Sequence, residues 1–294
     1  MNNMPELRRK RLKALLDKNK VIKVIEASNG LSGLIAEQTT VDGKEFDAMW
    51  LSSLCDSTYK GKPDNECVDF SSRVNTINEI FEVTTKPLIV DGDTGGKVEH
   101  FKKNIQTLER LGVSAIVIED KKGLKQNSIL GDSVNQELED IDVFSNKIIE
   151  GKKVLCTDDF MIFARIESFI AGKDLNDALL RARAYINAGA SGIMIHSYKS
   201  DGKEIIEFLK CFKEEYPNIP IILVPTTYNH FTETELKQIG ANIVIYANHL
   251  LRSAYKAMKQ TAEAILKDEC SMNVSKNNCS SMNEILNLIG EEND

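Results

Sequence analysis

Eight short apolar segments, rich in β-branched residues, recur along the chain and are separated by stretches with the period of an amphipathic helix. The segments are VIKVIEA (21–27), FDAMWL (46–51), PLIVDGD (87–93), AIVIED (115–120), FMIFARIES (160–168), GIMIHS (192–197), IILVPT (221–226) and IVIYAN (243–248). Helical periodicity is clearest at 98–112, 174–189 and 201–216. Continuous apolar strands that alternate with helices indicate a parallel sheet covered on its outer face, and eight repeats indicate closure into a (β/α)8 barrel. An open, doubly wound sheet is the alternative, but no G-x-G-x-x-G motif follows the first segment.

The length of 294 residues suits one such barrel, which typically takes about 250 residues, with some chain left over. We expect a catalytic barrel domain with an N-terminal helix over residues 1–269 and a polar C-terminal appendage over 270–294. The appendage contains a short helical pattern at 282–289. Hydrophobic residues make up 42% and charged residues 28% of the chain, which is typical of a globular protein and not of a disordered or fibrous one.

Charge and apolar run lengths exclude several classes of function. The chain carries 37 Lys and Arg against 44 Asp and Glu, a net charge of −7, so a basic face for nucleic acid is not expected. No stretch approaches 18 uninterrupted apolar residues, and the N-terminus has no signal-peptide core, so neither a membrane span nor export is expected. The six cysteines show no zinc-site spacing and are expected to be reduced thiols of a cytoplasmic protein. The basic run at 8–13 is interpreted as the solvated face of an amphipathic helix.

Charged side chains collect at the C-terminal ends of the predicted strands, where the active site of a barrel of this kind forms. Asp91, Asp93 and Glu119 end two neighbouring strands and would repel one another unless a cation lay between them. Carboxylate oxygens select Mg²⁺ or Mn²⁺, so these three are predicted metal ligands. The alternative is that they cap the following helices or pair with Lys121 and Lys125.

Two further strand ends carry groups that can stabilise negative charge. Arg165 and His196 would supply positive charge and hydrogen bonds to an enolate oxygen or a carboxylate. The alternative for His196 is a core histidine whose hydrogen bonds are satisfied within the barrel.

Two long polar segments, 52–68 and 121–137, are predicted loops that follow strand C-termini, where such loops are usually functional. The second, called here the lid loop, contains Lys125, Asn127 and Ser128, a set suited to binding a phosphoryl group, unless it is only a solvated loop. Gly123 and Gly131 would let the lid loop open and close. From the composition of the first loop alone, Asp64 is expected at the surface.

Taken together, nine ordered motifs resemble the phosphoenolpyruvate mutase family of the isocitrate lyase superfamily over about residues 21–269. They are WLSSL (50–54), KPDNE (62–66), DGDTGG (91–96), GVSAIVIEDK (112–121), KQNS (125–128), ARIESFIAG (164–172), AGASGIMIHS (188–197), VPT (224–226) and YANHLLR (246–252). The resemblance implies a barrel whose last helix is exchanged between subunits, and a homo-oligomer built as a tetramer of paired dimers. It also implies Mg²⁺ dependence and interconversion of the small molecules phosphoenolpyruvate and phosphonopyruvate, the P–C bond-forming step of phosphonate biosynthesis.

The resemblance also implies roles for individual residues, carried over position by position. The pocket-lining and substrate-binding positions are Trp50, Ser52, Ser53, Leu54 and Ser128. The catalytic and gating positions are Asp64, Lys125, Asn127, Arg165 and His196, and the Mg²⁺ positions are Asp91, Asp93 and Glu119.

Departures from the family patterns separate the remaining alternatives. Ser53 stands where the family often has glycine, which permits the closest amide approach to a phosphoryl group. The lyase branch is marked by a KKCGH motif, whereas this chain has KKGLK, so carbon–carbon cleavage is disfavoured. A phosphonopyruvate hydrolase on the same scaffold has Thr in place of the lid Asn, and KQNS favours the mutase over it. A non-catalytic metabolite-binding barrel is the other alternative, although the acidic cluster is intact.

Overall fold

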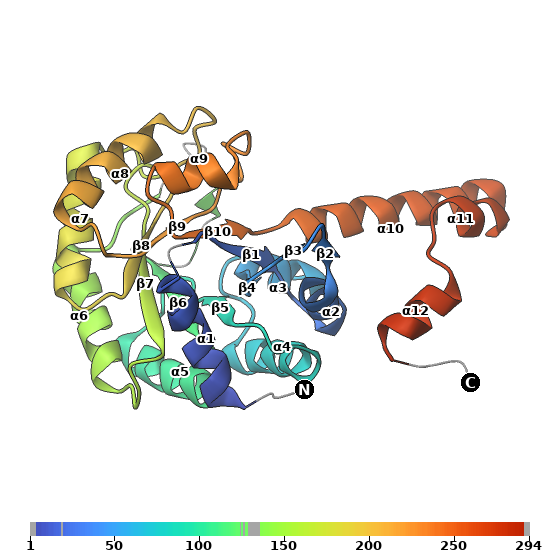
Figure 1. The fold of residues 1–294 in the computed structure, drawn as a ribbon, viewed down its shortest axis with the longest axis horizontal. Helices are drawn as coiled ribbons and strands as arrows, with labels where there is room; N and C mark the ends of the chain where they lie inside the picture. The colour runs from blue at the N-terminus through green and yellow to red at the C-terminus, as the bar shows by residue number, and fades with distance from the viewer. Residues whose placement is uncertain (1–3, 19, 124, 126, 129–135, 291–294) are drawn as a thin grey trace. The chain divides into compact units, whose positions relative to one another are not determined.

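The computed structural model describes residues 4–18, 20–123, 125, 127–128 and 136–290. The chain separates into two compact units, Met1–Ala247 and Asn248–Asp294. The first unit is a closed barrel of eight parallel strands enclosed by helices (Figure 1). All eight predicted strand segments contain a barrel strand, which confirms the (β/α)8 architecture.

The barrel strands follow one another around the ring in chain order, with β10 closing onto β1. Their bounds are β1 Ile22–Glu26, β4 Ala48–Leu51, β5 Leu88–Asp91, β6 Ala115–Glu119, β7 Met161–Ile166, β8 Gly192–Ile195, β9 Ile221–Leu223 and β10 Ile243–Tyr246. The helices of this unit are α1 Pro5–Leu16, α2 Gly30–Gln38, α3 Ser53–Tyr59, α4 Phe70–Val83, α5 Val98–Leu111, α6 Ile141–Lys153, α7 Leu175–Asn187, α8 Lys203–Glu215 and α9 Glu233–Gln238. A small antiparallel pair, β2 Thr40–Val41 and β3 Lys44–Glu45, stands outside the barrel.

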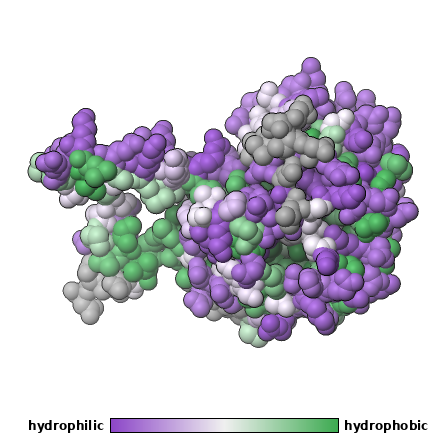
Figure 2. All heavy atoms as spheres, turned by 180° about the vertical axis from the view of Figure 1, so that it is seen from behind, coloured by the Kyte–Doolittle hydropathy of each residue, from purple (hydrophilic) through white to green (hydrophobic). Residues whose placement is uncertain are grey.

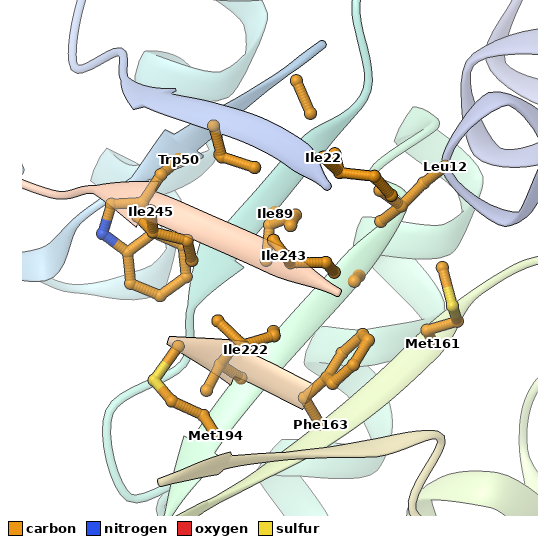
Figure 3. Close-up of a cluster of buried hydrophobic side chains, with 14 of the residues drawn as sticks. Leu12, Ile22, Trp50, Ile89, Met161, Phe163, Met194, Ile222, Ile243 and Ile245 are labelled. Atoms are coloured by element: carbon orange, nitrogen blue, oxygen red, sulfur yellow. The ribbon is translucent and has the colours of Figure 1, made fainter. Parts of the chain in front are cut away.

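The barrel interior is filled by one cluster of buried apolar side chains, to which every barrel strand contributes (Figure 3). Side chains alternate between the two faces of a strand, so every second residue points inward. Val117 of β6 and Phe163 of β7 lie in this cluster and are partners in register. Two residues further along, the partners are Glu119 and Arg165. The alternation that fills the barrel therefore also points these two charged side chains into its C-terminal mouth.

The expectation of a loop throughout 52–68 is wrong in part, because residues 53–59 form α3. The side chain of Ser52 accepts a hydrogen bond from the backbone N–H of Cys55 and so caps the start of this helix. The cap fixes the chain direction directly after β4.

The N-terminal helix α1 differs from the expectation of a solvated basic face, because Arg8 and Arg9 are buried. Arg8 donates to the backbone carbonyls of Thr84 and Lys86, at 2.8 Å for Lys86. Arg9 donates to the carbonyl of Glu109. These hydrogen bonds to backbone carbonyls offset the cost of burying the charge of the two guanidinium groups.

The second unit consists of α10 His249–Asp268, α11 Met272–Asn277 and α12 Met282–Leu288. Several large apolar side chains on α10 are exposed, among them Tyr255, Met258 and Leu266. Hydrophilic residues cover much of the face of the first unit seen in Figure 2, whereas hydrophobic residues gather on part of the second. The predicted division at residues 269/270 falls within the second unit, between α10 and α11, and stays a prediction.

Among the described helices, none combines the length and apolar content needed to cross a membrane. All six cysteines are free thiols.

Candidate active site

The mouth of the barrel holds a dense network of buried charges. Strand β5 ends at Asp91, and the turn that follows carries Asp93. The two carboxylates meet the ammonium group of Lys125 from the lid loop: Lys125 Nζ lies 3.2 Å from Asp91 Oδ2 and 2.8 Å from Asp93 Oδ1. The alternative of ion pairs with lysine is thus present for Lys125, and Lys121 Nζ also lies 4.0 Å from Glu119 Oε1.

Ser53, at the start of α3, joins the same cluster. Its hydroxyl donates to Asp91 Oδ2 over 2.8 Å and also contacts Lys125 Nζ. The backbone N–H of Ser53 points at the same carboxylate oxygen, at 3.3 Å. A side chain at this usual glycine position therefore adds a hydrogen bond to Asp91 that glycine cannot make.

The charges around Asp91 and Asp93 keep both carboxylates ionised. Burial alone would raise the pKa of Asp91, but Lys125, Arg165 and Arg73 lower it below its ordinary value. Burial likewise opposes ionisation of Asp93, whose pKa is nevertheless lowered by Lys125 and Arg73. In return, the carboxylates raise the pKa of Lys125 against the effect of its burial. Both sides of the cluster are charged at neutral pH.

Glu119 is different, because burial dominates and raises its pKa to about 7 despite the nearby cations Arg165 and Lys125. Arg165 Nη1 lies 3.2 Å from Glu119 Oε2, yet neither carboxyl oxygen accepts a hydrogen bond from the described residues. A buried carboxyl group with unsatisfied oxygens needs a further cation or donor. The donor set of Asp91, Asp93 and Glu119, all oxygen, fits a hard divalent ion in this respect.

Within the described ranges, no three His, Cys, Asp or Glu side chains converge closely enough to form a complete ligand set. Magnesium in phosphoryl-transfer sites is typically held by one or two carboxylates together with water and substrate oxygens, so a partial protein ligand set suits it. The metal-ligand roles of the three residues stay predictions.

A second cluster surrounds Glu167, which stands two residues after Arg165, just beyond the end of β7. Its carboxylate accepts hydrogen bonds from Arg165 Nε and from the hydroxyl of Ser128, the latter over 2.6 Å. Lys121 Nζ lies 3.1 Å from Glu167 Oε2. His196 Nδ1 lies 2.9 Å from Glu167 Oε1, which orients the imidazole ring. One carboxylate thus holds both Arg165 and His196 at the mouth.

Arg165 and His196 are the two groups that could stabilise negative charge on a substrate, and His196 is the weaker base of the two. Burial and the adjacent Arg165 lower its pKa, and the attraction of Glu167 only partly offsets them. Near neutral pH the imidazole is therefore largely neutral and offers a hydrogen bond instead of a full charge.

The described part of the lid loop also reaches Asp64. The side-chain amide of Asn127 donates to Asp64 Oδ2 over 3.0 Å, and Lys125 Nζ lies 3.6 Å from Asp64 Oδ1. The side chain of Asp64 is only 7% exposed, so the surface position expected from loop composition is wrong. Gly131, the second expected hinge, lies outside the described residues.

The remaining predicted pocket residues lie on or just after β4. Trp50 is buried in the barrel core cluster, Ser52 caps α3, and Leu54 is half-buried in the first turn of α3. Their predicted contact with substrate stays a prediction.

Sequence reasoning assigned no role to two buried charges, Arg73 and Glu167. Arg73 of α4 donates to the backbone carbonyl of Asp91 and to Asp93 Oδ2. The position of Arg73 in the sequence could have indicated a structural role. It shares the buried face of its helix with Ile77 and Ile80, and a charge on a buried face needs a partner. Glu167 stands two residues after Arg165 and so shares its inward direction.

The fold and this mouth define an enzyme of the (β/α)8 class whose carboxylates and cations converge at the C-terminal ends of the strands. Residues 12–266 match the profile of the family described as phosphoenolpyruvate phosphomutase. The chain belongs to this phosphoenolpyruvate mutase family. Its relatives support an enzyme of the isomerase class.

Individual relatives show how close the mutase and hydrolase branches are. The chain is 35% identical to the phosphoenolpyruvate phosphomutase of Tetrahymena pyriformis, over 96% of this chain and 91% of the relative. It is 33% identical to the phosphonopyruvate hydrolase of Variovorax sp. (strain Pal2), over 96% of this chain and 94% of the relative.

Solved structures from both the mutase and the hydrolase branch also superpose closely on this chain. A phosphoenolpyruvate phosphomutase from Streptomyces platensis subsp. rosaceus superposes with a TM-score of 0.89 at 32% identity, covering 96% of this chain and 95% of that one. A phosphonopyruvate hydrolase in complex with oxalate and Mg²⁺ superposes with a TM-score of 0.86 at 31% identity, covering 97% and 95%.

Proposed function

We propose that this enzyme interconverts phosphoenolpyruvate and phosphonopyruvate by transfer of the phosphoryl group within one substrate molecule. The observation that carries the proposal is the contact between the amide of Asn127 and Asp64, 3.0 Å long, beside Lys125. It is made by an asparagine of the KQNS motif, at the position where the hydrolase pattern has threonine. An amide donates hydrogen bonds without placing a hydroxyl beside phosphorus.

The reaction breaks the bond between phosphorus and the enol oxygen and forms a bond between phosphorus and C3 of the resulting pyruvate enolate. No proton is taken up or released in the net reaction. A loose, metaphosphate-like transfer depends on positioning and on stabilisation of charge more than on a strong base. The buried, paired charges of this mouth supply that kind of environment.

Each cluster of the mouth has a separate task in this proposal. Arg165 and His196 hold the carboxylate and the enolate oxygen of the substrate, both oriented by Glu167. Lys125 and Asn127 approach the phosphoryl group from the lid loop. Ser53 and Leu54 line the pocket at the start of α3, where Ser53 also holds Asp91.

Asp91, Asp93 and Glu119 would hold a divalent cation, Mg²⁺ or Mn²⁺. When bound, the ion would neutralise charge on the substrate oxygens and fix their orientation. The mutual positions of Asp91 and Asp93 are set by the chain itself, through Ser53, Lys125 and Arg73.

The hydrolase is the second candidate, favoured by a 33% identity that nearly equals that to the mutase of Tetrahymena. The two differ in whether water reaches the phosphoryl group before the enolate does. Lid residues that keep water out therefore decide between the products.

We further propose a cytoplasmic homo-oligomer, a dimer or a tetramer, in which α10 packs on a neighbouring subunit. The proposal is supported by the exposed apolar side chains of α10, since a helix that leaves Met258 and Leu266 in water is better satisfied by a partner. The free thiols are consistent with a reducing compartment. The role in phosphonate biosynthesis follows from the proposed reaction.

A coupled assay starting from phosphonopyruvate tests the proposed reaction. With lactate dehydrogenase and NADH alone, a hydrolase would cause NADH oxidation, because it releases pyruvate that lactate dehydrogenase reduces. The mutase requires pyruvate kinase and ADP in addition, because its product must first be converted to pyruvate. NADH oxidation at the full rate without pyruvate kinase would contradict the mutase assignment and support the hydrolase.

A further inference from the structure

Arg73 is a buried arginine outside the barrel interior that contacts both acidic residues of the β5 end. It lies on α4, is 7% exposed, and donates from Nη1 to the backbone carbonyl of Asp91 over 2.7 Å. The same nitrogen donates to Asp93 Oδ2 over 3.0 Å. One guanidinium nitrogen therefore links the main chain of the first acidic residue to the side chain of the second.

The turn that Arg73 contacts has an unusual backbone. Asp93 has a backbone φ of 53°, in the left-handed region that residues other than glycine seldom adopt. Its N–H points at Asp91 Oδ1, 3.2 Å away. Between them, Gly92 packs so tightly that a Cβ would lie 2.7 Å from Ile116. A conformation of this kind persists where its surroundings hold it.

The other side of the Arg73 guanidinium is anchored to α3. Nε lies 3.7 Å from Asp56 Oδ2, and Asp56 is completely buried and accepts a hydrogen bond from Thr76 over 2.8 Å. Helix α3 begins at Ser53, whose hydroxyl donates to Asp91. Arg73 therefore contacts Asp91 directly, and it is also linked to Asp91 through Asp56 and Ser53, which both lie on α3.

We propose that Arg73 is a positioning residue, which orients the carboxylates of Asp91 and Asp93 toward one shared cation. This inference rests on the cation site of the proposed function. Arg73 acts through the two aspartates and not by touching substrate. Groups in this position typically change metal affinity by about 10- to 100-fold when they are replaced.

Charge and geometry predict opposite results, which makes the proposal testable. Arg73 is itself a cation, and Coulomb repulsion alone predicts that its removal would strengthen binding of a divalent ion. Loss of orientation predicts weaker binding. Arg73→Lys keeps the charge while losing the planar fork of donors, so it isolates geometry. Arg73 borders a cavity of about 200 Å³, and lysine is shorter than arginine, so Arg73→Lys introduces no steric clash.

The test measures Mn²⁺ binding to the full chain without substrate, from the decrease in the electron paramagnetic resonance signal of free Mn²⁺. We expect the dissociation constant to rise about 10-fold or more in both Arg73→Lys and Arg73→Met. Affinity that is unchanged or higher in Arg73→Lys would overturn the proposal. If Arg73→Met does not fold, Arg73→Lys alone decides.

Arg8→Met is the matched control. Arg8 is also buried, and it holds the carbonyls of Thr84 and Lys86 that precede the same strand β5, at its opposite end. Its replacement should lower the melting temperature and leave Mn²⁺ affinity unchanged. An equal loss of affinity in Arg8→Met would make the effect of Arg73 one of general stability and overturn the proposal. A wild-type protein that binds no Mn²⁺ would remove the cation site itself, a different result from unaltered affinity in the variants.

Discussion

The ammonium nitrogen of Lys125 lies 2.8 Å from Oδ1 of Asp93, at the end of the barrel strand whose carboxylates are the predicted cation ligands. The lysine and a divalent cation would thus draw on the same oxygens. Lys125→Met should lower turnover by about 10²-fold or more, the scale for losing one well-placed donor to a transition state. The same variant should bind Mn²⁺ at least as tightly as the wild type, because a competing positive charge is gone.

Steady-state kinetics and a Mn²⁺ titration on the same preparation check both parts of this prediction. Lys125→Arg, which keeps the charge, serves as the comparison. Weaker Mn²⁺ binding in Lys125→Met would mean that the lysine supports the cation site and does not compete with it.

Removal of divalent metal should abolish activity, because the oxygens of Glu119 accept no hydrogen bond from the described residues and the proposed substrate is anionic. Treatment with EDTA followed by Mg²⁺ or Mn²⁺ should restore turnover. Asp91→Ala should be inactive under all of these conditions yet folded. Asp47→Ala changes the same residue type just before β4, at the opposite end of the barrel, and should stay active. Full turnover in chelator would contradict the metal assignment.

Asn127→Ala removes the amide that contacts Asp64. We expect mutase turnover to fall by about 10²-fold or more, as for other single transition-state donors, with the remaining flux shifted toward pyruvate and phosphate. Asn187→Ala, at the exposed end of α7, is a control that should change neither rate nor product. Phosphorus NMR quantifies both products, and unaltered mutase turnover in Asn127→Ala would exclude the residue from the mechanism.

Light scattering tests the assembly. The exposed apolar residues of α10 predict a particle of at least twice the 32.9 kDa chain mass. Met258→Glu should weaken the assembly, because it places a charge on that apolar face, whereas Lys259→Glu changes an exposed charged position next to it and should have less effect. An active, strictly monomeric protein would contradict the exchange of the last helix.

The barrel was predictable because its signals are local and repeated. Each strand is a short apolar run, and the alternation along a strand places Glu119 and Arg165 two residues beyond core positions Val117 and Phe163. The sequence order of strands then brings their ends to one mouth. Most of the candidate site follows from these two rules.

The parts that were not predictable depend on packing between distant segments. Nothing local to Arg73 or Arg8 indicates which carbonyls they reach, because Asp91 and Thr84 come near them only after the helices dock on the barrel. The burial of Asp64 has the same origin, since it depends on Lys125 and Asn127 arriving from the lid loop. Long-range contacts of this kind leave no periodic pattern in the sequence.

The central claim is that phosphorus moves between oxygen and carbon of one substrate without reaching water. Phosphorus NMR of the purified enzyme with Mg²⁺ and phosphonopyruvate tests it most directly, because phosphonopyruvate, phosphoenolpyruvate and inorganic phosphate give separate signals. We predict that the phosphoenolpyruvate signal appears and that the same mixture is reached from phosphoenolpyruvate, with little inorganic phosphate. Accumulation of inorganic phosphate as the main product, with no phosphoenolpyruvate signal, would contradict the account.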